Sequence, residues 1–470
     1  MARPVAAVDL GATSGRVFVG TADARGIHVE PVARFPNQPL TLPSGVHWDV
    51  GALWSGLLAG LRTAGERAPD LASVGIDTWG ADYGLLRAGR LLGLPHHYRD
   101  SRNDAGVAVV HGTIGAAELY RRTGLEPLPF NTLYQLVADR EEGILAAART
   151  MLFMPDLLGY WLTGQAATEP TIASTSGLLE LGGSSWQEDL LVDLGLPAWL
   201  LPAVLTPGDP LGPLIEPAAS RTGLGECVLV RKVASHDTAS AVVGTPLEVP
   251  GAVYLSCGTW SLLGLETRTP MADERARAAR FTHEAGIDGT VLLQKNLMGL
   301  GLVSGLLAEE PADLQEVLGA AADARLEPGQ LLDPADPSFL RPGSTAVAIR
   351  QWFQDHDVAP PQGLPALVRC VVESLAEAFA GGIRDLEALT GRAVPVVHVV
   401  GGGSQNALLC QATADRCDRS VVAGPVEASV IGNVLVQARA QGDLDEDLAG
   451  LRDVVRRSYA LTRYEPRRSP

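Results

Sequence analysis

The sequence is poor in cysteine, in aromatic side chains and in positive charge. Its five cysteines are scattered without C-x-x-C spacing, which argues against a disulfide framework and is typical of free thiols in a reducing compartment. Aromatic residues make up 5% of the chain, and 37 basic residues face 54 acidic ones, for a net charge of -17. So acidic a surface argues against a nucleic-acid partner, because binding a phosphate backbone needs clustered Lys and Arg.

The sequence also lacks any uncharged apolar stretch of about 18 residues, so no membrane span is expected. The apolar run at the N-terminus resembles a signal peptide only superficially. Asp9 cuts it short, and the segment is more typical of a buried strand. We therefore expect a cytoplasmic protein, monomeric or homodimeric, with neither a membrane nor a nucleic acid as its partner.

The chain does have ample apolar content, 46% of 470 residues. This length predicts roughly three domains, or two large ones. Two similar hairpins favour two domains, because an apolar run, a turn of Gly, Thr and Ser, and a second apolar run occur at residues 5–20 and again at 252–266. We predict domains at residues 1–245 and 246–470. The alternation of strands with helices predicts the α/β class.

Hydrophobic periodicity predicts helices at residues 48–67, 365–389, 406–417 and 427–440, and a mostly helical stretch at 100–156. Further strands are predicted at residues 71–77, 228–233, 394–400 and 421–422. The proline-rich stretch at 194–217 predicts an extended connection. Gly432 lies inside the last helix, where a glycine costs about 1 kcal/mol. We therefore expect close packing there against another backbone or a ligand.

The turn Asp9–Arg16 is the first candidate site. A strand that ends in Asp and continues as Gly-Ala-Thr-Ser-Gly supplies successive N–H groups and two hydroxyls at a sharp turn. Such a turn can form an anion site for phosphates. Asp9 could hold Mg²⁺, which prefers carboxylate and water oxygens, and Arg16 could reach phosphate oxygens. The alternative is an ordinary hairpin with Asp as a turn former.

Asp237 is the second candidate. It follows the predicted strand at 228–233 and opens a helix of small residues. A carboxylate at a helix N-terminus is stabilised as an anion, which suits a group that accepts a proton from a substrate hydroxyl. The alternative is an Asp that only caps the helix.

Two glycine turns in the second half complete the set. Gly258–Ser261 offers Thr259 and backbone N–H groups to phosphates. Gly401–Asn406 has three consecutive glycines between a strand and a helix, where a purine or ribose could approach bare backbone. Asn406 stands where G-x-G-x-x-G has its third glycine, which argues against a dinucleotide-binding oxidoreductase. Trp79–Asp82 and Asn296 could contact a sugar, although a core Trp and a turn Asn explain them equally well.

In their order along the chain these segments resemble the FGGY family of carbohydrate kinases over residues 5–439. The segments that carry the resemblance are Asp9–Arg16, Asp77–Asp82, His236–Ala241, Gly258–Ser261, Asn296–Leu300 and Gly401–Asn406. The resemblance implies two actin/hexokinase-like (ribonuclease H-like) domains with an active-site cleft between them. Sugar and phosphates would bind the N-terminal domain, and the nucleotide would bind the C-terminal one. The implied reaction transfers the γ-phosphoryl group of ATP to a primary hydroxyl of a ketose, with L-rhamnulose as the expected substrate and Mg²⁺ as cofactor.

The resemblance also implies roles for single residues. Asp237 would be the catalytic base, and Asp9 would bind Mg²⁺. ATP would be contacted by Thr13, Ser14, Gly15, Arg16, Thr259 and Gly402. The sugar would be contacted by Gly80, His236, Asp237, Thr238 and Asn296. Ser304 stands where relatives tend to have a longer glutamine that reaches the nucleotide, so it could make that contact only through water.

Two other functions remain open on the residues alone. One is a kinase of the same family that acts on L-fuculose, xylulose or a related polyol, which the pocket residues would decide. The other is an actin-like or chaperone-like ATP-binding protein, which would need no base between its phosphate turns and no sugar-contacting residues.

Overall fold

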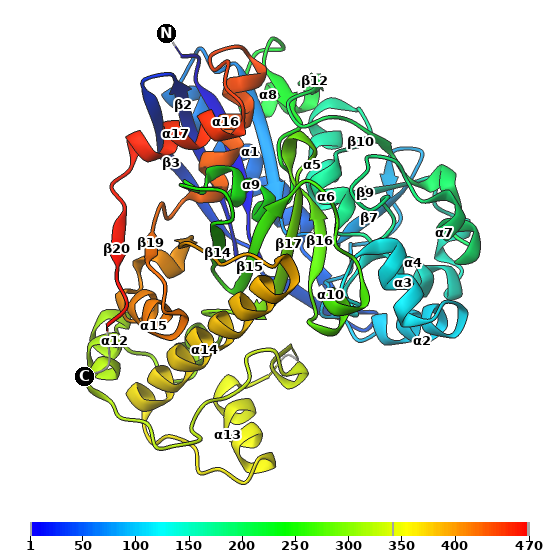
Figure 1. Ribbon diagram of the computed structural model, residues 1–470. Helices are drawn as coiled ribbons and strands as arrows, with labels where there is room; N and C mark the ends of the chain where they lie inside the picture. Colours follow the sequence, from blue (N-terminus) through cyan, green and yellow to red (C-terminus); the bar gives the residue numbers. More distant parts are fainter. Residues whose placement is uncertain (1, 341–342, 468–470) are drawn as a thin grey trace. The chain divides into compact units, whose positions relative to one another are not determined.

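The computed structural model describes residues 2–340 and 343–467, and the chain forms two compact units (Figure 1). Unit 1 contains the residues up to Pro246 together with Glu266–Leu293 and Ala428–Ser458. Unit 2 contains Leu247–Leu265, Gln294–Glu427 and the residues from Tyr459 onward. Both units combine sheets and helices, which confirms the predicted α/β class.

Unit 1 is built on a six-stranded sheet of order β12-β13-β6-β1-β2-β3. The bounds of its strands are β1 Val5–Leu10, β2 Ser14–Asp23, β3 Gly26–Pro36, β6 Ser73–Thr78, β12 Pro210–Pro213 and β13 Leu229–Arg231. The predicted first hairpin is confirmed, because β1 pairs antiparallel with β2. On its other side β1 pairs parallel with β6, and β6 pairs parallel with β13. The carboxyl ends of these three strands therefore lie at one edge of the sheet.

The proline-rich stretch contributes the edge strand β12. Pro210 and Pro213 bound this strand, and an edge tolerates proline because one side of its backbone needs no ladder hydrogen bond. The smaller sheets of unit 1 are formed by β4 Pro39–Leu42 with β5 Gly45–Trp48, by β7 Tyr83–Arg87 with β8 Arg90–Leu91 and β9 Thr150–Phe153, and by β10 Ala167–Thr168 with β11 Ala203–Val204. Strand β9 interrupts the stretch 100–156, which was predicted to be mostly helical.

Helices α1 (Val50–Arg67) and α16 (Ala428–Ala440) cover opposite faces of the main sheet. A Cβ at Gly60 of α1 would contact Val17, whereas a Cβ at Gly20 would contact Val434 of α16. Residues 17 and 20 of one strand point to opposite faces because side chains alternate. Figure 1 shows α16 and α17 (Leu448–Ser458), from late in the chain, beside β2 and β3 from its beginning. The other helices of unit 1 are α2 Asn103–Thr113, α3 Ala116–Thr123, α4 Thr132–Glu141, α5 Met154–Thr163, α6 Pro170–Ser174, α7 Glu188–Asp193, α8 Glu216–Thr222, α9 Asp237–Gly244 and α10 Glu274–Ala278.

A seven-stranded sheet has the order β16-β17-β15-β14-β18-β19-β20. Its strands are β14 Val253–Cys257, β15 Trp260–Thr267, β16 Thr282–Ala285, β17 Val291–Met298, β18 Val397–Val400, β19 Val421–Ala423 and β20 Thr462–Tyr464. The chain passes between the units along β15 and β17. The second predicted hairpin is confirmed, because β14 pairs antiparallel with β15. It also pairs parallel with β18 on its other side, so this hairpin enters its sheet as the first one does.

Helix α14 is the longest helix of unit 2, and α11, α12 and α15 pack against it. Their bounds are α11 Gly301–Glu309, α12 Leu314–Asp323, α13 Thr345–Asp355, α14 Leu364–Thr390 and α15 Ala407–Cys417. Helix α14 packs against α15 and α12, and α14 and α15 agree with the predicted helices. Among the described residues, no helix has the length and apolarity that crossing a bilayer requires. All five cysteines are free thiols.

Helices α9 and α16 approach each other through two glycines. A Cβ at Gly432 would overlap the carbonyl oxygen of Ser240, and a Cβ at Gly244 would overlap the carbonyl oxygen of Ala428. Beside this contact the hydroxyl of Ser240 donates to the carbonyl oxygen of Ser429, 2.8 Å away. The prediction of close packing at Gly432 is therefore confirmed, and the neighbouring backbone is that of α9.

Replacing Gly432 with Ala should destabilise the protein by about 3 kcal/mol, because the new methyl group meets rigid backbone rather than a movable side chain. Urea unfolding measures the loss. Gly112→Ala is the matched control, since Gly112 lies in α2 with no atom near its Cβ position, and this change should raise stability by up to about 1 kcal/mol. A Gly432→Ala variant as stable as the wild type would contradict the backbone contact.

Candidate active site

The turn between β1 and β2 presents backbone and hydroxyl groups to the surface. The N–H of Gly11 donates to the carbonyl oxygen of Ser14 at 3.0 Å and closes the turn. Asn37, which directly follows β3, braces the turn: its amide side chain donates to the carbonyl oxygen of Gly11 at 2.9 Å, and its N–H donates to that of Thr13 at 3.0 Å. Thr13 is exposed and Ser14 is half-buried, so both hydroxyls can reach a ligand. Gly15 is different, because it is buried and a Cβ there would overlap Phe35.

Asp9 lies near the end of β1, just before this turn, and its carboxylate accepts hydrogen bonds from two side chains. It lies opposite Arg16 in the hairpin, and the Arg16 guanidinium donates to its Oδ2. The hydroxyl of Ser429, at the start of α16, donates to the same oxygen at 3.2 Å. Arg16 is half-buried and also lies over the ring of Phe18, 5.6 Å from its centroid. The structure thus fixes both predicted charges of the turn on the face that α16 covers.

Asp77, which the sequence did not single out as a site residue, lies level with Asp9 on the adjacent strand β6. Its side chain is fully buried. Oδ2 accepts a hydrogen bond of 2.6 Å from the Asn433 amide of α16, while Oδ1 has no hydrogen-bond partner. Burial, followed by the charge of Asp9, raises the pKa of Asp77 well above its ordinary value. The available signal was its position at the end of a strand directly before Thr78, where functional side chains often lie.

The loop before α9 is held by buried polar groups of α6. Glu169 is the N-cap of α6, and its carboxylate also accepts the N–H of Ser235 at 3.0 Å. The hydroxyl of Thr171 accepts the N–H of His236 at 3.2 Å. On the other side the N–H of Thr78 donates to the carbonyl oxygen of Ser235 at 2.9 Å. The loop therefore enters α9 beside the end of β6.

His236 is the N-cap residue of α9 and Asp237 is its first residue, so Asp237 is not the cap that the alternative reading required. The Asp237 carboxylate accepts a hydrogen bond of 3.3 Å from the hydroxyl of Thr238. It lies 3.4 Å from Nε2 of His236 and keeps 32% of its side-chain surface exposed. The Asp237 carboxylate is therefore not used to cap the helix, and a substrate hydroxyl can reach it.

A second acidic partner of His236, Glu284 of β16, was missed by the sequence. Its Oε2 lies 2.9 Å from Nδ1 of His236. Burial lowers the pKa of His236, but the charge of Glu284 and its hydrogen bond, followed by the charges of Asp237 and Glu169, outweigh burial and raise it to about 9. Burial raises the pKa of Asp237 to about 6. The charge of His236 opposes this rise and that of Asp9 adds to it.

The segment Trp79–Asp82 is divided between core and surface. Asp82 is buried and accepts hydrogen bonds from the indoles of Trp48 and Trp79, at 2.6 and 3.1 Å, and from the amide of Gln135 at 2.9 Å. Burial raises the pKa of Asp82 to about 6 despite these donors. Trp79 is only 6% exposed, so the packing favours a core role for both side chains. Gly80 remains half-buried with Thr175 against its Cβ position.

Unit 2 carries the remaining predicted residues. Thr259 is half-buried in the turn between β14 and β15, and its carbonyl oxygen accepts the N–H of Gly299 at 3.0 Å. Gly402 is exposed with no atom near its Cβ position, whereas a Cβ at Gly403 would overlap Cys257. Asn296 is half-buried in β17, and Ser304 is exposed on α11. The glycine turn thus leaves bare backbone at Gly402, as the sequence predicted.

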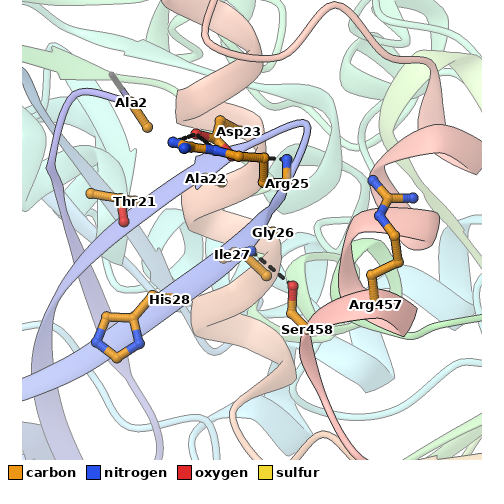
Figure 2. A pocket seen from close by; sticks show the side chains of 10 residues that line it. All are labelled: Ala2, Thr21, Ala22, Asp23, Arg25, Gly26, Ile27, His28, Arg457 and Ser458. Atoms are coloured by element: carbon orange, nitrogen blue, oxygen red, sulfur yellow. Dashed lines mark hydrogen bonds and ion pairs between the residues drawn. The ribbon is translucent and has the colours of Figure 1, made fainter.

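A separate shallow pocket of about 510 Å³ lies at the β2–β3 hairpin (Figure 2). Its lining includes Arg25, which donates to Asp23 at 2.7 Å, and Ser458, whose hydroxyl accepts the N–H of Ile27 at 2.9 Å. The Arg457 guanidinium donates to the carbonyl oxygen of Ala24 at 3.0 Å. No sequence-predicted site residue lines this pocket.

Known proteins and family models align with nearly the full length of this chain. The models of the FGGY family of carbohydrate kinases match residues 5–244 with the N-terminal domain and residues 253–441 with the C-terminal domain. A protein of Pectobacterium carotovorum named rhamnulokinase is 40% identical, with 98% of this chain and 93% of the relative aligned. A rhamnulokinase of Bacteroides thetaiotaomicron is 39% identical, with 98% and 95% aligned. The crystal structure of a xylulose kinase from Rhodospirillum rubrum has a TM-score of 0.78 at 19% identity, covering 99% of this chain and 94% of that one.

Replacing Asp237 with Asn should stabilise the protein at neutral pH. A carboxyl whose pKa rises on folding from 3.8 to about 6 costs stability wherever it is ionised in the folded state, and this cost disappears once both states are protonated. The gain in melting temperature should therefore be complete above pH 7 and fade as pH falls from about 6 toward 4. Asp70→Asn, at an exposed position, is the control and should show no such trend. An Asp237→Asn variant less stable than the wild type at pH 7.5 would contradict the raised pKa.

Proposed function

The chain belongs to the FGGY family of carbohydrate kinases and is an ATP-dependent sugar phosphotransferase, and we propose that it phosphorylates the primary hydroxyl of L-rhamnulose to give L-rhamnulose 1-phosphate. The proposed substrate is supported by two relatives named rhamnulokinase, about 40% identical over almost the whole of both chains. The free thiols of the chain fit a reducing compartment, and we place the enzyme in the cytoplasm.

One observation carries the chemical part of the proposal. Asp237 presents a partly exposed carboxylate at the edge of the sheet where β1 ends, beside the turn between β1 and β2 that we propose to bind phosphates. The charge of Asp237 interacts with that of Asp9. With a pKa of about 6 it is ionised at neutral pH, yet basic enough to take a proton as it leaves a hydroxyl.

The proposed step is an in-line displacement. The primary hydroxyl of the sugar gives its proton to the carboxylate of Asp237, and its oxygen bonds to the γ-phosphorus as the bond to the β-phosphate oxygen breaks. ADP leaves with that oxygen. Such a transfer needs mainly positioning and charge neutralisation, which the turns and their charged residues can supply.

The remaining predicted residues take binding roles in this proposal. The phosphates and nucleotide are contacted by Thr13, Ser14, Gly15, Arg16, Thr259 and Gly402. Gly15 contributes only its backbone, because Phe35 occupies the space of a side chain. The sugar is contacted by Gly80, His236, Thr238 and Asn296. Ser304 is exposed but short, so its contact with the nucleotide would pass through water.

The carboxylates beside the turn fit a magnesium ion. Mg²⁺ is usually held by one or two carboxylates together with substrate phosphates and water. Asp9 lies at the turn, and its neighbour Asp77 has a buried Oδ1 without a hydrogen-bond partner. We assign Asp9 to the ion. When bound, Mg²⁺ would neutralise charge on the transferring phosphates.

A panel of sugars in a coupled ADP-release assay tests the proposed substrate. L-Rhamnulose should give the highest kcat/KM, at least about tenfold above L-fuculose, D-xylulose and glycerol, because a polar pocket discriminates strongly against misplaced hydroxyls. Phosphorus NMR should identify the 1-phosphate. A preference for another ketose would contradict the substrate. ATP hydrolysis at the same rate with and without every sugar would instead favour an actin-like ATPase.

A further inference from the structure

Glu284 occupies a fixed position in β16. On one side of it the N–H of Ala285 donates to the hydroxyl of Ser174 at 2.9 Å, which ties the strand to α6. On the other side the N–H of His283 donates to the carbonyl oxygen of Gly124 at 3.0 Å, and Nδ1 of its ring lies 2.9 Å from the same oxygen. The backbone that carries Glu284 is therefore anchored at both neighbouring residues.

The ring of His236 bridges Glu284 and Asp237. Nδ1 lies 2.9 Å from Oε2 of Glu284, and Nε2 lies 3.4 Å from Oδ1 of Asp237. Nδ1 of His236 and Oε2 of Glu284 are within hydrogen-bond distance but are poorly aligned, so the attraction between them is mainly that of opposite charges. The side chains of His236 and Glu284 are 9% and 8% exposed, so water screens this pair little.

The groups that face the ring carry negative charge. They are Glu284 from β16, Asp237 from α9 and Glu169 from the start of α6. Burial alone would favour a neutral ring, but these charges reverse the balance and raise the pKa of His236 to about 9. At neutral pH the pair is therefore an imidazolium beside a carboxylate.

We propose that Glu284 is a positioning residue of the phosphoryl transfer, holding the ring of His236 and its positive charge against Asp237. Glu284 acts through His236 and needs no contact with either substrate. The inference rests on the proposed function, because the benefit of the charge is to keep Asp237 ionised as a base.

The need for that charge follows from the other groups around Asp237. Burial favours its protonated form, and the negative charge of Asp9 does so as well. Among the groups that act on Asp237, His236 is the leading one that opposes burial. If the imidazolium lost its proton, the pKa of Asp237 would rise, and less of the base would be ionised near neutral pH.

The test compares Glu284→Gln, Glu284→Asp and a matched control in the full-length protein. Glu126→Gln is the control, because Glu126 is likewise a buried glutamate held in an ion pair, here with Arg280 at 2.6 Å. Protein labelled at histidine Cε1 is titrated by NMR without ligand. His236 is identified among the nine histidines by the resonance missing in His236→Gln.

The expected result has two parts. The pKa of His236 falls in Glu284→Gln by roughly three units, from about 9 to near or below the Asp237 pKa of about 6. It is largely restored in Glu284→Asp and is unchanged in Glu126→Gln. The acid limb of the kcat/KM profile of the transfer moves to higher pH only in Glu284→Gln, while its limiting rate at high pH is largely retained.

Either of two results would overturn the inference. One is a His236 pKa that is the same in Glu284→Gln and wild type. The other is a His236 pKa that falls to about 6 or below while the acid limb stays where it is in the wild type. The titration needs no substrate, and the profile can be recorded with whichever ketose the wild type phosphorylates. A failure of L-rhamnulose as substrate would thus contradict the proposed function and leave this test decisive.

Discussion

The crowding of three carboxylates at one edge of the unit 1 sheet is the constraint on which the site depends. Asp9 and Asp77 lie level on paired strands, and the charges of both interact with other acidic groups of the site. Each carboxylate has its own compensation. Arg16 pairs with Asp9, the Asn433 amide bonds to Asp77, and His236 lies against Asp237. Burial, and after it the repulsion from neighbouring carboxylates, holds the pKa of Asp77 and Asp237 high, which costs stability wherever these groups are ionised.

Some of the groups that bond to these carboxylates come from helix α16, far away in the sequence. A close backbone contact at a glycine allows this helix to approach. Helix α16 reaches the sheet because Gly432 meets α9 without a Cβ. From there Ser429 bonds to Asp9, Asn433 to Asp77, and Gln437 to the carbonyl oxygen of Ala6 at 3.0 Å. The loop before Asp237 is held by Glu169 and Thr171, whose buried side chains accept hydrogen bonds from backbone N–H groups of that loop. Asp237, the proposed base, is thus positioned by rigid elements on both sides.

Local patterns in the sequence predict part of this arrangement. The hairpin at Asp9–Arg16, the helix around Gly432 and the position of Asp237 at a helix start each follow from a few adjacent residues. Glu284 could not be found in this way, because strand β16 reaches His236 only through tertiary packing on α6. Asp77 was overlooked for a similar reason, since its meaning comes from strand register with Asp9. Trp79 and Asp82 show the converse, because residue types suited to a sugar site bond to each other in the core.

The central claim is that Asp237 accepts the proton of the sugar hydroxyl. The most direct test measures phosphoryl transfer and ATP affinity in the Asp237→Asn variant at pH 7.5, with Asp70→Asn as control. The account predicts that kcat falls by a factor of about 10² to 10⁴, while the Kd for ATP, measured by calorimetry, stays at the wild-type value. Wild-type turnover in Asp237→Asn would contradict the account.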